Sequence, residues 1–289
     1  MTLCNKISAF LNEQSITHDT VTIEGHSVVL AHTKGKSVFI IPVAQTSYTP
    51  DKAIGQSLSI SGCIDSMTKV YGERPIVVTE DRWIRQESMT KARLLAHLEV
   101  FSQIYARNCE VRKIDKDTAA EFLKQNHSYG DASCRYRYGL YLRRHTGHNA
   151  EEQRHIGELI AVATFSNARK WIKGEKTIRS YEWTRYASLP DLRISGGMGK
   201  LLKAFIAEVK PDDLMTYADL EWSEGKVYEA LGFILESFKK PVMFSIDTCS
   251  WERTAVRSEE HADVAGQSGN RYFQNFGSNK YRLKLTDYQ

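Results

Sequence analysis

The sequence lacks an apolar run long enough to cross a bilayer. No stretch of its 289 residues approaches the roughly 18 to 20 apolar residues that a transmembrane helix needs. The first residues also lack the ordered basic region, long apolar run and small-residue cleavage site of a secretory signal. These absences predict a protein without membrane association, located in the cytoplasm.

The cysteines lack the spacing of a metal knuckle or of a disulfide framework. There are five of them, an odd number spread over the whole chain, and no pair forms a CxxC motif. Apolar residues make up 42% of the chain, which is enough to build a core of normal size without disulfides or metal. We therefore expect reduced, mostly buried thiols and no metal site.

A strong excess of one charge is also missing, because the formal net charge is only +4. Basic residues nevertheless gather locally in two places, around 135–144 and around 169–176. Such patches can contact the phosphates of CoA or of a nucleic acid. A solvated surface without a partner is the alternative for each patch.

The first part of the chain, 1–105, predicts a small α/β domain. Helical spacing of apolar residues indicates helices, and short β-branched runs indicate strands. A turn at Lys34-Gly35-Lys36 joins two of the strands. The predicted helices span 3–13, 51–58 and 87–101, and the predicted strands span 20–23, 27–31, 37–42 and 75–79.

The second part, 106–250, predicts a mixed sheet flanked by helices. Asp115 or Asp117 caps a helix that ends near Gln125. Three strands, a glycine-rich loop, a helix, a strand, a helix and a last strand follow. The predicted strands span 136–142, 158–166, 178–187, 214–220 and 242–246, and the later helices span 199–209 and 223–231. Residues 251–289 predict a mobile loop and a C-terminal strand near 281–285, so the fold class is α/β (α+β).

The glycine-rich segment Arg193–Lys200 follows a strand and opens a helix. Glycine lets the backbone approach a bulky anion, and the free N–H groups of a first helical turn attract phosphate. We therefore expect Arg193, Gly196, Gly197, Gly199 and Lys200 to hold a pyrophosphate. A tight loop without a ligand is the alternative. The segment is no P-loop, since Leu201 stands where Ser or Thr belongs, and no Rossmann fingerprint, since its strand does not begin a βαβ unit.

The order of elements resembles that of the GNAT (Gcn5-related N-acetyltransferase) fold. Glu182–Tyr186 through Gly199–Leu202 resembles the CoA-binding strand, loop and helix of that fold. Tyr228–Phe233 resembles its next signature, a tyrosine-containing helix that ends in Gly-Phe. The resemblance implies acyl transfer from acetyl-CoA or another acyl-CoA.

A narrower resemblance concerns the Mom-like DNA-modification proteins of phages and bacteria. The motifs that carry it follow one another in this order: Ile104–Cys109, Asn126–Gly130, Ala163–Phe165, Gly196-Gly197 with Lys200–Leu202, and Thr216–Asp219 with Trp222–Gly225. Asn275–Tyr281 is a further match. It implies that the acceptor is a base of DNA. Some relatives carry an N-terminal half that resembles homing endonucleases, and 75–98 resembles its end.

The N-terminal half nevertheless lacks the clustered acids of a nuclease. A nuclease needs neighbouring carboxylates, usually with Lys or His, to hold a metal and activate water. The acids and the histidine available here are scattered: Glu24, His26, Asp51, Glu80 and Asp81. We therefore expect a degenerate nuclease-like half without nuclease activity, whose remaining role would be docking or DNA contact.

Three residues are candidates for catalysis. The resemblance implies that Tyr228 is the general acid toward the leaving thiolate, and a core tyrosine is the alternative. Asp219 follows a strand and could orient or deprotonate the acceptor, unless it only caps the next turn. Glu182 lies three residues before Arg185, so we expect the two side chains to face opposite sides of the strand.

Five residues are candidates for substrate binding. His127 and Tyr129 end the first helix of the second part, and Arg185 lies on the strand before the glycine loop. Arg169 and Lys170 stand beside Trp171, an arrangement in which an aromatic ring stacks on a base while cations hold phosphates. Ordinary capping and strand packing are the alternatives.

Three functions therefore compete. The first is an acyl-CoA-dependent transferase acting on a nucleic-acid base. The second is a non-catalytic DNA-binding or accessory protein that kept the fold and lost the cofactor. The third is a conventional small-molecule or protein N-acetyltransferase, although its acceptor site would be acidic whereas the hairpin near 173 is basic. The oligomeric state is left open.

Overall fold

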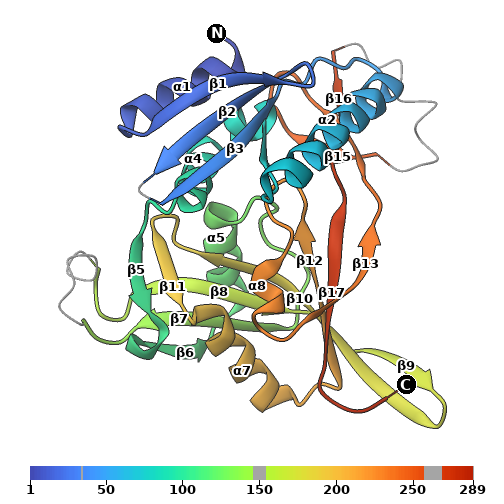
Figure 1. Ribbon diagram of the computed structural model, residues 1–289. Helices are drawn as coiled ribbons and strands as arrows, with labels where there is room; N and C mark the ends of the chain where they lie inside the picture. The colour runs from blue at the N-terminus through green and yellow to red at the C-terminus, as the bar shows by residue number, and fades with distance from the viewer. Residues whose placement is uncertain (34, 146–153, 257–268, 289) are drawn as a thin grey trace. The chain divides into compact units, whose positions relative to one another are not determined.

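The computed structural model describes residues 1–33, 35–145, 154–256 and 269–288 (Figure 1). The chain divides into two compact units, each assembled from three segments. Unit 1 comprises 1–99, 218–226 and 237–279, and unit 2 comprises 100–217, 227–236 and 280–289. The two units thus share the chain in alternation, unlike the consecutive domains that we expected from the sequence. Residues 257–268, which make up most of the expected mobile loop, lie outside the described residues.

Unit 1 contains a four-stranded sheet with the order β1-β2-β3-β4. The strands span β1 Thr17–Ile23, β2 His26–Thr33, β3 Lys36–Val43 and β4 Ile76–Thr79. The first three pair antiparallel, and β4 joins β3 in parallel. This pattern requires a crossover between β3 and β4, which α2 provides.

The helices of unit 1 are α1 Leu3–Glu13, α2 Pro50–Tyr71, α3 Glu80–Arg85 and α4 Glu87–His97. Helix α2 is much longer than the predicted 51–58. It begins at the Thr49 cap, whose side chain accepts from the Lys52 N–H at 3.4 Å, and ends at Gly72 in the left-handed conformation. Helix α3 was not predicted, since it is short. A second sheet has the order β15-β14-β16, with strands Arg253–Ala255, Met243–Ile246 and Arg271–Gln274.

Unit 2 is built on a mixed sheet with the order β13-β17-β12-β10-β8-β7-β6, to which β9 is added by pairing with β10. In chain order the strands are β6 Cys109–Lys113, β7 Tyr136–Leu142, β8 Leu159–Phe165, β9 Arg169–Lys173, β10 Lys176–Ser188, β12 Asp213–Asp219, β13 Ile234–Lys239 and β17 Ser278–Lys284. The predicted mixed sheet flanked by helices is therefore confirmed. A separate pair, β5 Ser102–Tyr105 and β11 Leu192–Ser195, runs in parallel.

Two helices cover opposite faces of this sheet. Helix α5, Lys116–Asn126, begins as predicted at Asp115, whose carboxylate accepts from the Thr118 N–H at 2.7 Å. Its Phe122 and Leu123 pack with Val162 and Ala187 on one face. Helix α7, Gly197–Val209, covers the other face, where its Phe205 ring stacks on Phe165 at 4.0 Å.

The predicted helix 223–231 is wrong in extent. Only α8, Lys226–Glu229, is helical. The Ser223 N–H donates to the Asp219 carbonyl, and Gly225 has φ +95°, so the chain turns before the helix can begin. The turn closes with the Leu231 N–H donating to Tyr228, and Gly232 has φ +88°.

No helix in the described ranges is both long and apolar enough to cross a membrane.

Candidate functional site

Strands β10 and β12 pair in parallel over only three residues. Their ladder joins Ser180 to Asp213 and ends where Glu182 meets Met215. Directly afterwards β10 contains a β-bulge, because the register with β8 shifts between Trp183 and Arg185. Bulges bend a strand and redirect its side chains, and they are common beside active sites. The sheet of unit 2 therefore loses its regular pairing at the point where the bulge begins.

Tyr228 lies against this point. A hydrogen bond joins its hydroxyl to the side chain of Thr216, whose own hydroxyl donates to the Trp183 carbonyl at 3.1 Å. The ring of Tyr228 packs edge-on to Trp183, with centroids 6.1 Å apart, and also contacts Phe233 and Tyr281. Burial raises the pKa of the Tyr228 phenol, so the hydroxyl stays protonated at neutral pH. Sequence reasoning singled out Tyr228 but missed Thr216 and Trp183.

The glycine loop forms the N-terminus of α7. Gly196 has φ +77° and caps the helix without any side-chain hydrogen bond. The first helical N–H with a backbone acceptor is that of Lys200, which donates to Gly196. The N–H groups that precede it in the first turn are thus the uncapped donors of a helix terminus. They can donate hydrogen bonds to an anion.

Packing explains two of the glycines. A Cβ on Gly197 would lie 2.9 Å from Ile194, and one on Gly199 would lie 3.2 Å from Leu231. Leu231 follows Tyr228 in the same turn, so the first turn of α7 lies beside the turn that carries Tyr228. Glycine at positions 197 and 199 therefore allows the start of α7 to approach Ile194 and Leu231 closely.

The two basic residues of the loop differ in their surroundings. The Lys200 ammonium donates to the carbonyls of Ala106, at 2.8 Å, and of Cys109. It holds the chain before β6 rather than projecting from the loop. Arg193 is exposed, with its guanidinium 5.2 Å from the ring centre of Phe101. Arg193 is therefore the cation of this segment that a ligand can reach.

Glu182 and Arg185 lie on the same face of β10, contrary to the prediction. The bulge inserts Thr184 as an extra residue, and this reverses the alternation beyond it. Burial lowers the pKa of the Arg185 guanidinium, and the Glu182 carboxylate partly offsets this effect. Arg185 also donates to the Gly130 carbonyl at 3.1 Å.

His127 and Tyr129 belong to the same neighbourhood. His127 ends α5, and its Nδ1 accepts from the Tyr129 N–H at 3.1 Å. The Tyr129 side chain is 42% exposed. Tyr129 interacts electrostatically with Arg185, so the two side chains lie near each other. The structure thus assembles His127, Tyr129, Glu182 and Arg185 on the face of the sheet that α5 covers.

Asp219, in contrast, belongs to unit 1. It ends β12, and its carboxylate accepts from the Glu221 N–H at 3.0 Å. Burial and the neighbouring Glu221 raise the pKa of the Asp219 carboxyl, while Arg82, 3.8 Å away, acts in the opposite direction. Its observed contacts are those of a turn-forming residue beside a buried charge network.

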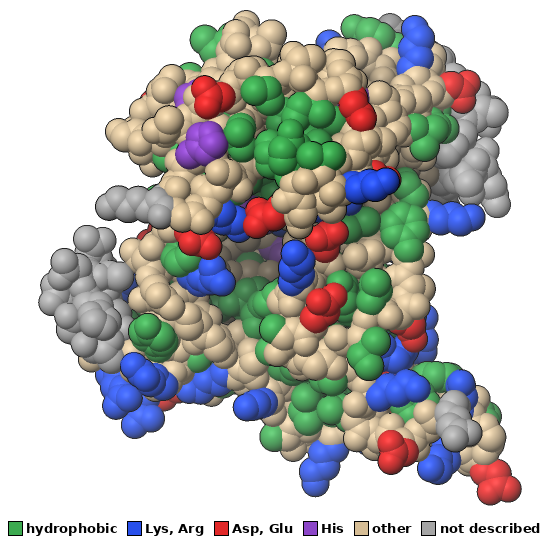
Figure 2. Space-filling model, in the orientation of Figure 1, with side chains coloured by type: hydrophobic (Ala, Val, Ile, Leu, Met, Phe, Trp, Pro, Cys, Tyr) green, Lys and Arg blue, Asp and Glu red, His purple; other side chains and the backbone are tan. Residues whose placement is uncertain are grey.

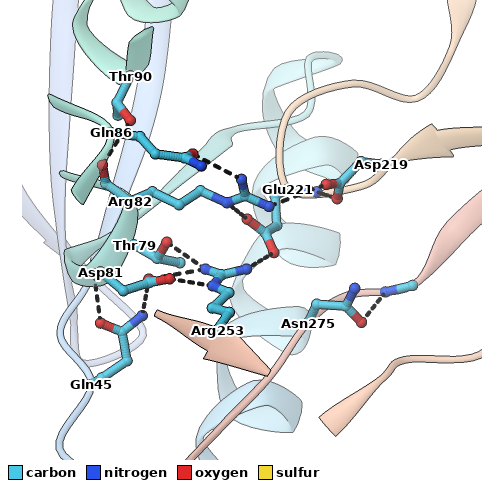
Figure 3. Close-up of polar contacts among 11 residues, drawn as sticks. Gln45, Thr79, Asp81, Arg82, Gln86, Thr90, Asp219, Glu221, Arg253 and Asn275 are labelled. Atoms are coloured by element: carbon cyan, nitrogen blue, oxygen red, sulfur yellow. Dashed lines mark hydrogen bonds and ion pairs between the residues drawn. The ribbon is translucent and has the colours of Figure 1, made fainter. Parts of the chain in front are cut away.

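Figure 3 shows this buried charge network of unit 1. Arg253 pairs with Asp81 and with Glu221, the latter at 2.9 Å. Arg82 donates to the other oxygen of Glu221 at 3.1 Å. The Glu221 side chain is 0% exposed and that of Asp81 is 3% exposed.

Burial raises the pKa of the Asp81 and Glu221 carboxyls, but Arg253 and Arg82 together with the hydrogen bonds outweigh it, so both pKa values are lowered. Gln45 adds a hydrogen bond to the Asp81 N–H at 2.9 Å. The network thus keeps two buried acids ionised. It joins three distant chain segments of unit 1, which no local sequence pattern reveals. Asp81, considered above as a possible nuclease acid, forms an ion pair with Arg253.

The remaining candidates, Arg169 and Lys170, are exposed residues of β9 at the base of its hairpin with β10, opposite Ser180 and Arg179. The structure does not join them to the residues around Tyr228 by any described contact. Among the described residues, no group of three or more His, Cys, Asp or Glu side chains is arranged to hold a metal ion.

Comparison with known proteins finds similarity only to solved structures. No protein-family model and no curated protein matches the chain. An N-acetyltransferase from Staphylococcus aureus Mu50 is 13% identical, with 62% of this chain and 99% of that one covered and a TM-score of 0.33. YncA of Salmonella typhimurium, a putative acetyltransferase solved with acetyl-CoA, is 13% identical, with 63% and 96% covered and a TM-score of 0.35.

Eis1 of Mycobacterium abscessus is 15% identical over 48% of this chain, with a TM-score of 0.33. The matched region spans only 34% of the length of Eis1. At such identities and TM-scores, these similarities assign neither a reaction nor a substrate to this chain. Both must come from its own residues.

Proposed function

We propose that unit 2 is an acyl-CoA-dependent N-acyltransferase of the GNAT type. The observation that carries the proposal is the end of the β10–β12 ladder at Glu182, followed by the bulge and joined through Thr216 to the Tyr228 hydroxyl. Beyond the three-residue ladder the Thr216 hydroxyl, and not a backbone N–H, donates to the Trp183 carbonyl, and Tyr228 adds a protonated hydroxyl at this point. The bulge therefore lies beside the hydroxyl that we propose to act in catalysis.

The N-terminus of α7 fits the phosphates of such a cofactor. Its uncapped first-turn N–H groups and helix dipole suit a pyrophosphate. Arg193, four residues before the helix begins, is exposed and adds a positive charge. Gly199 lies beside Leu231, which links this terminus to the turn of Tyr228. Lys200 contributes by fixing the loop to Ala106 and Cys109, and Gly196 by taking the left-handed conformation.

Residues of this chain can be assigned to the individual steps of acyl transfer. Bound acyl-CoA would supply a thioester for attack by an amine, with a thiolate as leaving group. Tyr228 holds its proton at neutral pH and can donate a hydrogen bond where the thiolate develops. Glu182, paired electrostatically with Arg185, is the carboxylate of unit 2 that can receive the proton of the amine. Asp219 is a weaker candidate, because its oxygens serve Glu221 and Arg82.

The acceptor that we propose is a nucleic-acid base, as the Mom-like resemblance implies. Tyr129 is partly exposed beside His127 and offers a ring on which an unpaired base can stack. Exposed Arg169 and Lys170 provide cations for phosphates.

Calorimetry with acetyl-CoA and CoA tests the cofactor. The incubation of acetyl-CoA with duplex DNA, followed by digestion and mass spectrometry of the nucleosides, tests the transfer. We expect Tyr228→Phe to slow transfer by about 10² or more while cofactor affinity is retained. Tyr281→Phe is the matched control, because it removes a phenol from the same aromatic cluster and should transfer at the normal rate. Failure to bind either cofactor at millimolar concentration would refute the proposal.

A second candidate is a non-catalytic DNA-binding protein that kept the fold. The observation in its favour is that Lys200 is turned to backbone carbonyls and that packing explains Gly197 and Gly199. This candidate predicts DNA binding without any heat of binding for acetyl-CoA. The same calorimetry therefore separates the two.

A further inference from the structure

The hairpin of β9 and β10 is an exposed two-stranded ribbon within unit 2, labelled β9 in Figure 1. Its register pairs Lys173 with Lys176, Trp171 with Ile178 and Arg169 with Ser180. Figure 2 shows Lys and Arg side chains, with a few acidic ones, gathered in the region where Figure 1 draws β9. Arg169, Lys170, Lys173 and Lys176 are all exposed.

One face of the ribbon is covered and the other is free. On the covered face, Ile178 is 3% exposed, and Trp171 packs edge-on to Tyr288 with centroids 5.5 Å apart. On the other face stand Lys170 and Ile172, and Ile172 is 77% exposed. The covered face holds the ribbon in place and also carries Arg169, Lys173 and Lys176, whereas the free face presents Ile172 together with Lys170 and Arg179.

The charges of the ribbon oppose each other across the strands. Lys173 stands directly opposite Lys176, and Lys170 stands opposite Arg179. Like charges in such positions destabilise a strand pair. In the described part of the chain, the ion pair recorded on this hairpin joins Arg179 to Asp212 at 3.4 Å, so the other four cations are not neutralised by a carboxylate. The Lys176 ammonium donates to the Asp287 carbonyl at 3.3 Å, and the Lys173 ammonium lies 5.6 Å from the centre of the Trp171 ring. Neither contact neutralises the charge, whereas a polyanionic partner would relieve the repulsion.

We propose that this hairpin is a docking element for double-stranded DNA. The major groove is about 12 Å wide and admits a two-stranded β-ribbon. In that position the four cations that pair with no carboxylate would reach the phosphates on both sides, and Ile172 would contact base edges such as the thymine methyl group. A lipid surface fits less well, because Ile172 is a single exposed apolar residue among charges.

The inference extends the proposed acyltransferase, since it concerns how a duplex that carries the acceptor base would be held. Binding of DNA by the hairpin does not need acyl-CoA. The two proposals can therefore fail separately: DNA binding is measured without cofactor, and cofactor binding is measured without DNA.

The test is fluorescence anisotropy of a labelled 20-base-pair duplex with the full chain over a range of salt. Four phosphate contacts predict a slope of log K against log salt of about −3.6, equivalent to a loss of about 150-fold between 50 and 200 mM. Lys173→Ala with Lys176→Ala should reduce this to about −1.8, or about 12-fold. The control is Lys116→Ala with Lys124→Ala, two exposed lysines on α5, which should keep the original slope.

Two further measurements separate docking from a structural role. Ile172→Ser should weaken binding at every salt concentration without changing the slope, because it removes no charge. The double Lys173/Lys176 variant should melt at a similar temperature, since removing the like-charge pair offsets the loss of the Lys176 hydrogen bond to the Asp287 carbonyl, while binding falls. A fall in melting temperature together with unchanged binding would show that the lysines serve the fold.

The proposal is overturned if the wild-type chain shows no salt-dependent binding to the duplex, or if the hairpin variant keeps the wild-type slope. It is also overturned if vesicles of anionic phospholipid bind through the hairpin while the duplex does not.

Discussion

Replacing Arg253 by Met should remove the centre of the buried charge network in unit 1. Arg253 is the only group shown to pair with both Asp81 and Glu221 in the described structure, and those side chains are 3% and 0% exposed. Methionine keeps much of the volume against Phe273, on which the guanidinium lies at 4.6 Å. Two buried carboxylates would then keep only Arg82 as a cation, through Glu221.

Breaking a buried pair by removing one partner costs about 3–5 kcal/mol, because an uncompensated buried charge is left behind. We therefore expect the free energy of unfolding of unit 1 at pH 7 to fall by about that amount. The matched control is Arg85→Met. Arg85 pairs with Glu252 at 3.2 Å, but both side chains are exposed, so that loss should stay below about 1 kcal/mol.

The effect should depend on pH in a defined direction. In the wild type the pKa values of Asp81 and Glu221 are lowered, so their contribution is present above the unfolded pKa values of about 4 and is lost as pH falls through the folded ones. Without Arg253, burial raises the pKa of Asp81 and is opposed only by the weaker effects of Arg82 and of the hydrogen bond with Thr79, so this pKa should rise. The variant should therefore recover stability as pH falls from 7 toward 5, and the difference from wild type should narrow.

Urea unfolding at pH 7 and pH 5, followed by tryptophan fluorescence, measures both effects. A loss no larger than that of Arg85→Met would refute the reasoning, because it would mean that the two acids are not held ionised by Arg253. A difference that stays constant between the two pH values would refute the pKa argument while leaving the contact itself intact.

Two further predictions concern unit 1. Gly277→Ala should lower the free energy of unfolding by well over the roughly 1–2 kcal/mol expected for a left-handed non-glycine residue, because its Cβ would collide with the Lys239 carbonyl. The control is Gly25→Ala, which has a similar positive φ but no atom near its Cβ. In urea unfolding it should lose only about that backbone amount. Burial and the nearby charges of Arg93 and Lys36 lower the pKa of His97 to about 4, so the unfolded chain takes up a proton first as pH falls below about 6.5. The free energy of unfolding of the wild type should thus fall by roughly 2–3 kcal/mol between pH 7 and pH 4, and that of His97→Gln should fall by less. If the unfolding free energies of the two proteins change in parallel with pH, this prediction is wrong.

Local signals in the sequence were sufficient for much of the secondary structure. The alternating β-branched runs gave the first strands of unit 1, and the Asp115 cap located the start of α5. Helix α2 was underestimated because its outer face carries apolar residues such as Leu58 and Val70, both exposed, which blur the helical period. The helix near Ser223 was overestimated because Gly225 takes a positive φ there.

The candidate site was predicted only in part, for physical reasons. Tyr228 and the glycine loop could be found, since their residue types and their order are local features. The bulge at Thr184 could not, because it arises from the register with β8, and it alone determines that Glu182 and Arg185 share a face. Nor could the pairing of Asp81 with Arg253, since 172 residues separate the two partners.

The same separation has a consequence during synthesis of the chain. At about 5–20 residues per second, Arg253 leaves the peptidyl-transferase centre roughly 10–30 s after Asp81. During that interval the β4–α3 corner carries an acid whose cation does not yet exist. Unit 1 can therefore gain its buried charge network only late, and until then the nascent segment must keep Asp81 hydrated or occupied by a temporary counter-ion.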